Sequence, residues 1–173
     1  MQFRDMQADV ITVFACDGGG YRIPNWITNQ YFSTDPARHI ALWSEADAAQ
    51  NGRLKPLMRL LKAWNREHGT FFRSFHLEAL CREIFAANDI GDYPSAVQLF
   101  FDRLRRKIYE PLPDPAGYGD DLGAYLTEGQ KRVIRLRLDA ALVRAEDALT
   151  DAYDGNANRA TAHWRHIFGV AIT

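Results

Sequence analysis

Four cations and one serine occupy positions from which they could bind phosphate groups. The cations are Lys55, Arg59, Lys62 and Arg66. Their spacing of three or four residues would place them on one face of a helix. Ser74 begins a later helical pattern, and the free N–H groups at a helix N-terminus suit an anion. A basic solvated face and an ordinary serine N-cap would give the same pattern, so both interpretations stay open.

A single carboxylate, Asp9, lies inside a run of β-branched and apolar residues at 8–14. Aspartate is depleted in strands, so a carboxylate there often faces a site, for instance a divalent metal. It could equally point to solvent or pair with an arginine. The local sequence does not separate these two interpretations.

Four other features could carry chemistry, and for each we favour a structural role. The glycines at 18–20 lack the Lys-Ser/Thr of a P-loop, which favours a hairpin turn. His163 and His166 have no further ligands nearby in the sequence, so a helix surface is expected rather than a metal site. The basic residues within 103–107 are expected to be solvated rather than to contact nucleic acid, and Cys81 is expected to be a buried thiol.

The elements that position these residues are mainly helical. A β-hairpin is predicted from strand-like residues at 8–14 and 21–23 with a glycine turn between them. Helices are predicted by apolar periodicity and by start and stop signals. These include Asp35-Pro36, Ser74 and Asn156 as caps and a capping box at 127–130. The six predicted helices span about 36–50, 54–68, 74–87, 94–109, 128–153 and 157–168.

The segment 110–126 contains three prolines and several glycines and is predicted to be a long loop. Structureless connections of this length are uncommon in compact domains. We therefore expect this proline-rich loop either to have a function or to be mobile.

Composition limits the class of protein. The chain has 173 residues, a formal net charge of -1 and 47% hydrophobic residues, which is typical of one globular domain. This excludes a disordered chain, a collagen-like repeat and a disulfide-dense miniprotein, and argues against a DNA-coating protein. No apolar run reaches the ~20 residues of a membrane span, and no signal peptide is recognisable. We expect a cytoplasmic protein with reduced thiols at Cys16 and Cys81.

The order of these motifs resembles a known family, the cGAS/DncV-like nucleotidyltransferases, or CD-NTases, which are related to oligoadenylate synthases. The run at 8–14 resembles the family's third catalytic-aspartate strand, and 57–65 is similar to its Lys-x-Trp helix. Each motif is weak alone, but together they cover nearly the whole chain in order. The other matching segments are 21–25, 33–36, 74–78 and 164–169.

The resemblance implies roles for three residues. Asp9 would be the third carboxylate of a site for two Mg²⁺ (or Mn²⁺) ions, and Lys62 and Ser74 would hold nucleotide phosphates. The family makes cyclic di- or trinucleotides from nucleoside triphosphates, and these products activate an effector in bacterial antiphage defence (CBASS). The implied partners are nucleoside triphosphates and a CBASS protein, with no membrane and no specific nucleic acid.

One departure from the family changes the expectation. The chain contains no Gly-Ser dipeptide and no two aspartates separated by one residue, although the family's palm begins with these motifs. We therefore expect the C-terminal part of such an enzyme, with the missing motifs upstream of Met1. Residues 1–33 would be the last palm strands and 34–173 the helical lobe. The chain alone would be inactive, because one carboxylate cannot hold two metal ions.

Two alternatives stay open. The chain could be a standalone helical module that binds nucleotides or a protein, including a separate N-terminal half. It could also be a destabilised product whose exposed hairpin edge leads to aggregation or dimerisation.

Overall fold

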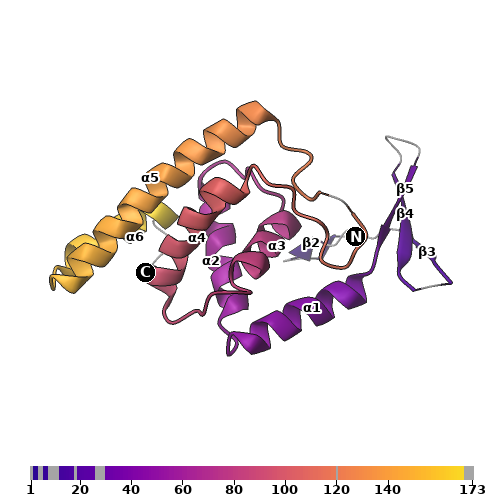
Figure 1. The fold of residues 1–173 in the computed structure, drawn as a ribbon, viewed down its shortest axis with the longest axis horizontal. Coiled ribbons are helices and arrows are strands. Elements are labelled where there is room, and N and C mark those ends of the chain that lie inside the picture. The colour runs from indigo at the N-terminus through magenta and orange to yellow at the C-terminus, as the bar shows by residue number, and fades with distance from the viewer. Residues whose placement is uncertain are drawn as a thin grey trace.

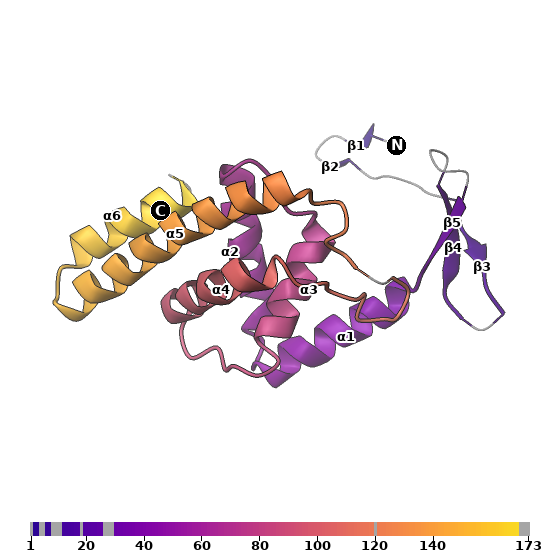
Figure 2. The ribbon, with the colours of Figure 1, turned by 45° about the horizontal axis from the view of Figure 1, so that its top comes forward.

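The protein is mainly helical, with short strands at its N-terminal end (Figure 1). The computed structural model describes residues 2–3, 6–7, 12–17, 19–25, 30–119 and 121–169. Figures 1 and 2 show the three-stranded sheet at one end of the molecule and α5 with α6 at the other. This architecture confirms the predicted fold class. The strands are β1 (Gln2–Phe3), β2 (Met6–Gln7), β3 (Phe14–Ala15), β4 (Tyr21–Asn25) and β5 (Gln30–Thr34), and the helices are α1 (Pro36–Ala49), α2 (Leu54–Glu67), α3 (Ser74–Ile84), α4 (Tyr93–Lys107), α5 (Glu128–Tyr153) and α6 (Ala157–Phe168).

The predicted glycine turn joins β3 to β4. The two strands are antiparallel, with Phe14 opposite Arg22, and Cys16 N–H donates to the Gly20 carbonyl at 3.1 Å. The predicted strand at 8–14 is only partly tested, because residues 8–11 lie outside the described residues. Residues 12 and 13 are not in a strand, and β3 begins later than predicted, at Phe14.

The sheet has a third strand that periodicity did not predict. β5 pairs with β4 along its whole length, from Tyr21 opposite Thr34 to Asn25 opposite Gln30. Pro24 lies inside β4, although it was expected to limit that strand. It is tolerated because β3 pairs with β4 only at Tyr21 and Arg22, so β4 has no described neighbour on that side at Pro24.

The six helices agree with prediction except at some ends. α3 ends at Ile84 rather than near 87, because the buried Gln50 side chain holds the following turn by donating to the carbonyls of Phe85 and Asn88. α4 starts one residue early, at Tyr93, because Asp92 accepts from the Ser95 N–H.

Two of the predicted caps are confirmed with their hydrogen bonds, one is confirmed in position only, and one is wrong. Asp35 accepts from the Arg38 N–H, and Thr127 and Gln130 form a reciprocal capping box. Ser74 is the first residue of α3 rather than its cap, which is Arg73. Asn156 occupies the cap position of α6 but its side chain makes no capping hydrogen bond. In both cases the sequence marks the start of a helix, but the serine or asparagine side chain does not form a capping hydrogen bond.

The core is built around α2. Leu57, Leu61 and Trp64 are fully buried on its apolar face, as their spacing predicts. This face packs against α3, α4 and α6, while α5 lies alongside α4 and α6 (Figure 2). The opposite face of α2 carries the four cations. Two of them are exposed to solvent and two contact carboxylates of α1 or α3.

The proline-rich loop, residues 110–126, packs onto the helices. Leu112 and Leu126 join the core, and the Asp114 carboxylate lies 2.7 Å from His39 Nε2 on α1. At the other side, a Cβ atom on Gly20 would lie 2.7 Å from the Tyr118 hydroxyl. The loop therefore contacts both the β3–β4 turn and the helical part of the chain.

Candidate functional site

The turn between α2 and α3 fixes the positions of Lys62 and Ser74. Asn65, which is buried, donates from Nδ2 to the Phe72 carbonyl at 2.8 Å and accepts from the Phe72 N–H at 3.0 Å. Because this amide pairs with both backbone groups of one residue, it holds the chain reversal in one conformation. α2 and α3 then pack side by side.

Lys62 forms an ion pair with Glu78 of α3. Glu78 follows Ser74 by four residues, so the two lie on the same face of α3, one turn apart. The arrangement brings Lys62 close to the N-terminal turn of α3. The structure therefore places the Lys62 ammonium group against α3, while the role of the two residues in phosphate binding stays a prediction.

Glu78 has a second partner on α1. The Trp43 indole N–H donates to Glu78 Oε2 at 3.0 Å, while Lys62 contacts Oε1. The carboxylate is thus held from two sides, and it in turn orients the Lys62 ammonium. Sequence reasoning missed Glu78 as part of this site; its position four residues after Ser74 was the available signal.

The other three cations of the predicted row differ from Lys62. Lys55 lies 3.9 Å from Asp47 and 3.4 Å from the Ser44 hydroxyl, both on α1. Arg59 and Arg66 are exposed. The row is therefore partly a solvated face, and Lys62 is the member directed toward α3.

Arg73 adds a cation beside Ser74. Its guanidinium lies 4.3 Å from the centre of the Tyr125 ring, and its backbone N–H donates to the Tyr125 hydroxyl at 2.9 Å. Tyr125 belongs to the proline-rich loop, which therefore borders the start of α3. Ser74 itself is exposed.

A buried histidine lies behind this surface. His76 Nδ1 is 3.1 Å from the Tyr125 hydroxyl. Burial lowers the pKa of His76 from 6.5 to about 4, with Asp121 opposing the shift and Arg73 adding to it. Burial alone would raise the pKa of Asp121, but hydrogen bonds from the backbone N–H groups of Leu112 and Gly123 outweigh it and lower that pKa. His76 is therefore neutral at pH 7 and serves packing rather than charge.

The expected buried thiol at Cys81 is confirmed. Its side chain is fully buried, and burial followed by the charge of Glu78 raises its pKa. A thiol held protonated is a poor nucleophile.

A cavity of about 330 Å³ opens next to Glu78, between α1 and α3. Its walls include Trp43 and Phe75, whose rings stack with centroids 5.5 Å apart and 13° between planes. His39 packs edge-on against Phe75, with ring centroids 4.8 Å apart. Lys55 lies at the rim. Aromatic walls with charged groups at the edge can hold a planar ring that carries an anionic substituent.

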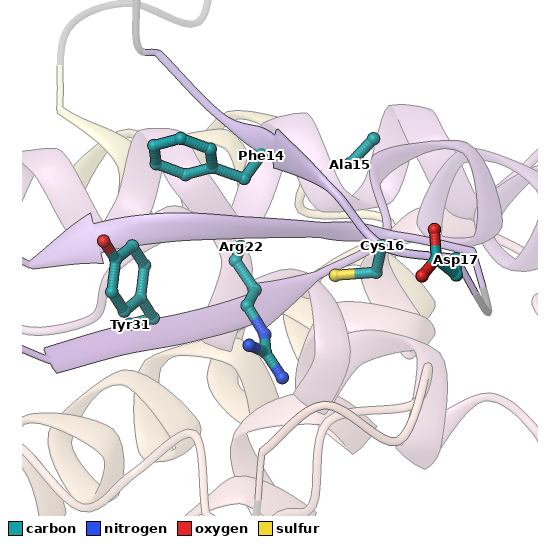
Figure 3. Close-up of a pocket in the computed structure, with 6 residues that line it drawn as sticks. All are labelled: Phe14, Ala15, Cys16, Asp17, Arg22 and Tyr31. Atoms are coloured by element: carbon teal, nitrogen blue, oxygen red, sulfur yellow. The ribbon is translucent and has the colours of Figure 1, made fainter.

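Another cavity, of about 480 Å³, lies on the three-stranded sheet (Figure 3). Phe14 and Tyr31 meet edge to face there, with ring centroids 5.9 Å apart. Figure 3 shows the Asp17 carboxylate at the turn and the Arg22 guanidinium pointing away from it. These two charged groups do not converge on one point, so the cavity offers no defined polar site.

The predicted metal carboxylate, Asp9, lies outside the described residues. Among the residues that the structure does describe, no group of three or more His, Cys, Asp or Glu side chains could hold a metal ion. These residues therefore do not fit a two-metal centre, and no chemical step through a metal is derived from them.

Two other sequence features have local partners. His163 Nε2 lies 3.3 Å from the buried carboxylate of Asp151, which agrees with a structural role on α6. In the basic cluster at 103–107, Arg105 and Arg106 contact Asp102, and Lys107 pairs with Glu83. Neutralisation by carboxylates agrees with a surface role for that cluster. Within the described part of the chain, no helix has the length and hydropathy needed to cross a bilayer.

Comparison with known proteins identifies relatives. No family model matches the chain. A cyclic AMP-AMP-AMP synthase from an Acinetobacter species is 25% identical over 184 aligned positions, which cover 98% of this chain. The chain spans about half of that relative, 51% of its length.

Two solved structures share the fold. The structure of Escherichia coli MS115-1 CdnC with ATP has a TM-score of 0.76 at 17% identity, covering 94% of this chain and 59% of CdnC. The CdnC:HORMA-deltaN complex has a TM-score of 0.78 at 18% identity, covering 99% of this chain and 62% of the matched chain. These similarities confirm the resemblance to CD-NTases that the motif order indicated.

Proposed function

We propose that this chain, a relative of the cGAS/DncV-like nucleotidyltransferases, is the C-terminal part of an enzyme that makes cyclic oligonucleotides from nucleoside triphosphates in bacterial antiphage defence. In this proposal residues 1–33 belong to the palm and 34–173 form the helical lobe. The lobe binds nucleotide phosphates, and the chain alone has no catalytic activity. We place the enzyme in the cytoplasm.

The observation that carries the proposal is the meeting of Lys62 with α3. Lys62 pairs with Glu78, which lies one helical turn after Ser74, and the first turn of α3 presents free N–H groups. Arg73 contributes a further positive charge at the same end of the helix. A triphosphate bound to this surface would contact the Lys62 ammonium group, the N–H groups at the start of α3 and the Ser74 hydroxyl.

The relatives support the identity of the ligand. The Acinetobacter relative is named as a synthase of cyclic AMP-AMP-AMP, and one CdnC structure contains ATP. We extend nucleoside triphosphate binding to this chain. The second CdnC structure contains a HORMA protein, and we likewise propose a protein partner for the enzyme of which this chain is part.

We assign catalysis of nucleotidyl transfer to groups that lie outside the described residues. Activation of a 3′-hydroxyl and stabilisation of the pyrophosphate leaving group are the chemistry that Mg²⁺ or Mn²⁺ would supply if carboxylates outside the described residues held it. Asp9 is the one proposed metal carboxylate in this chain. Lys62 and Ser74 would hold and orient the triphosphate, which fixes the direction of attack.

A second candidate function is a standalone module that binds a nucleotide or a protein without catalysis. The absence of Gly-Ser and Asp-x-Asp from the sequence favours it. The two candidates differ in the size of the native product, because catalysis needs a longer chain.

The test is to express the reading frame from its native locus with the upstream sequence in place. We expect a product heavier than 19.7 kDa that converts ATP or GTP with Mg²⁺ into a cyclic product, whereas the 173-residue chain alone does not. A native product of 19.7 kDa would support the standalone module instead. Cyclic product from the 173-residue chain alone would contradict its proposed inactivity.

The site assignment has its own test in the longer enzyme. Asp9→Asn should abolish catalysis with an unchanged melting temperature, because it removes a metal carboxylate without changing side-chain size. Near-normal turnover of the Asp9→Asn variant would show that residues 8–14 are wrongly assigned as the catalytic-aspartate strand.

A further inference from the structure

A cluster of basic side chains lines a cavity that the proposed nucleotide site does not use. The cavity has a volume of about 140 Å³ and lies where the C-terminal end of α2 meets α5 and α6. Its floor is apolar and includes Ile167. The basic residues around it are His68, Arg137, Arg144 and His166.

These groups come from α5, α6 and the C-cap of α2, and they line one cavity. Arg137 and Arg144 are seven residues apart on α5, so they lie on one face of that helix. His68 follows the end of α2, where its ring stacks on Trp64 with centroids 5.3 Å apart. Its Nδ1 lies 2.9 Å from the Trp64 carbonyl oxygen, which can only accept, so Nδ1 donates. Nε2 then donates to an anion only when the ring is the doubly protonated imidazolium, so the two arginines are the constant donors of the cluster.

The cluster lacks the acidic partners that neighbouring cations have. On the same helix, Lys131 pairs with Glu128, and Arg135 pairs with Asp139. Within the described residues, no carboxylate lies within 4.0 Å of the basic groups of Arg137 or Arg144. Both arginines lie in the middle of a 26-residue helix, where no helix end offsets their charge. Two like charges gathered around one hollow repel each other, and a bound anion would offset that repulsion.

We propose that this cavity binds a phosphate group, as inorganic phosphate or as a phosphate monoester. A tetrahedral oxyanion accepts hydrogen bonds from several directions, whereas a planar carboxylate is satisfied by one guanidinium. The apolar floor and the absence of described carboxylates exclude a hydrated metal cation as the ligand here. The site is distinct from the nucleotide surface, because the residues that line the cavity do not include Lys62, Ser74 or Glu78.

Calorimetry of the 173-residue chain with sodium phosphate, at ionic strength matched with sodium chloride, tests the proposal. We expect saturable binding that Arg137→Gln and Arg144→Gln each weaken by about tenfold or more, since each removes a charge-assisted hydrogen bond. Arg132→Gln is the matched control, because Arg132 is exposed on the same helix and does not line the cavity. Its affinity should equal that of the unmodified chain.

A parallel titration with adenosine 5′-monophosphate separates the two phosphate sources. If adenosine 5′-monophosphate binds more tightly than phosphate and loses affinity in the same two arginine variants, the ligand is a phosphate monoester. If it binds equally or more weakly, the ligand is inorganic phosphate. The proposal is overturned if phosphate does not bind, if Arg132→Gln weakens it as much, or if the binding is lost in Lys62→Ala and kept in the two α5 variants. Lys62→Ala should leave phosphate binding at this cavity intact. The variant therefore distinguishes a failure of the phosphate proposal from a failure of the proposed nucleotide site.

Discussion

At the scale of single residues, the account depends on side chains that hold other side chains in place. Glu78 accepts from both Trp43 and Lys62, and Asn65 pairs with both backbone groups of Phe72. Neither residue was a candidate from sequence, because a motif shows which residue types are present and not which of them meet. Lys62 and Ser74 were candidates because helix geometry places a row of cations and a helix N-terminus in the sequence, and the resemblance implies that these two residues hold phosphates.

The first prediction concerns Asn65. Asn65→Ala should lower the free energy of unfolding by about 2–4 kcal/mol, because it leaves two buried backbone groups of Phe72 without partners. Urea denaturation followed by circular dichroism measures this. Asn156→Ala is the control, because Asn156 is exposed and makes no capping hydrogen bond, so its effect should stay within about 0.5 kcal/mol. Equal effects of the two variants would contradict the assigned role of Asn65.

At the scale of elements, the helices were predictable and the connections were not. The 3.6-residue pattern of α2 and the capping box of α5 are local signals, so the sequence alone locates both helices. β5 and the packing of the proline-rich loop depend on contacts between distant segments, such as Asp114 with His39. The aromatic cavity was missed for the same reason, since Trp43 and Phe75 are brought together only by the packing of α1 on α3.

The second prediction tests the contact between the loop and the sheet. Gly20→Ala should displace Tyr118, because the added Cβ would lie 2.7 Å from its hydroxyl, and hydrogen exchange in the proline-rich loop should accelerate. Gly19→Ala is the matched control, since Gly19 also has a positive φ (90°) but no atom within 4 Å of the added Cβ. Both variants carry the backbone cost of a left-handed alanine, of about 1 kcal/mol.

The two variants differ in steric contact: a Cβ on Gly20 would lie 2.7 Å from the Tyr118 hydroxyl and 3.0 Å from the Thr34 carbonyl oxygen, whereas a Cβ on Gly19 has no atom within 4 Å. Loop exchange that rises equally in both would show that the backbone conformation, rather than Tyr118, causes the effect. Combining Gly20→Ala with Tyr118→Leu should slow exchange in the loop again, because it removes the hydroxyl and leaves only the longer contact with the Thr34 carbonyl oxygen.

At the scale of the whole molecule, the helices form one core and the charged features lie around it. α2 contacts α1, α3, α4 and α6, so the faces of one helix serve both the core and the proposed phosphate surface. The metal role of Asp9 is implied by the resemblance, and this residue lies outside the described residues. The sequence therefore predicts the helices well, whereas the proposed phosphate-binding residues and the proposed metal carboxylate stay predictions.

The third prediction is a pH dependence of global stability. The pKa of His76 is about 4 in the folded protein and 6.5 when unfolded, so the unfolded chain binds the proton more readily. The contribution of His76 to the free energy of unfolding is fully present above pH 6.5 and is lost as the pH falls toward 4. The loss should be about 2–3 kcal/mol in denaturant titrations across this window. His76→Gln should flatten the profile between pH 6.5 and 4, and an unchanged slope in that variant would assign the effect to other groups.

The most direct test of the central claim is calorimetric titration of the 173-residue chain with ATP, with and without Mg²⁺, beside its Lys62→Ala variant. Lys131→Ala is the matched control, because it also removes a lysine from an ion pair, with Glu128 on a different helix. The account predicts ATP binding that Lys62→Ala weakens by about 1.5–3 kcal/mol and Lys131→Ala leaves unchanged. Absence of ATP binding under both conditions, or equal affinity of the Lys62→Ala variant and the unmodified chain, would contradict it.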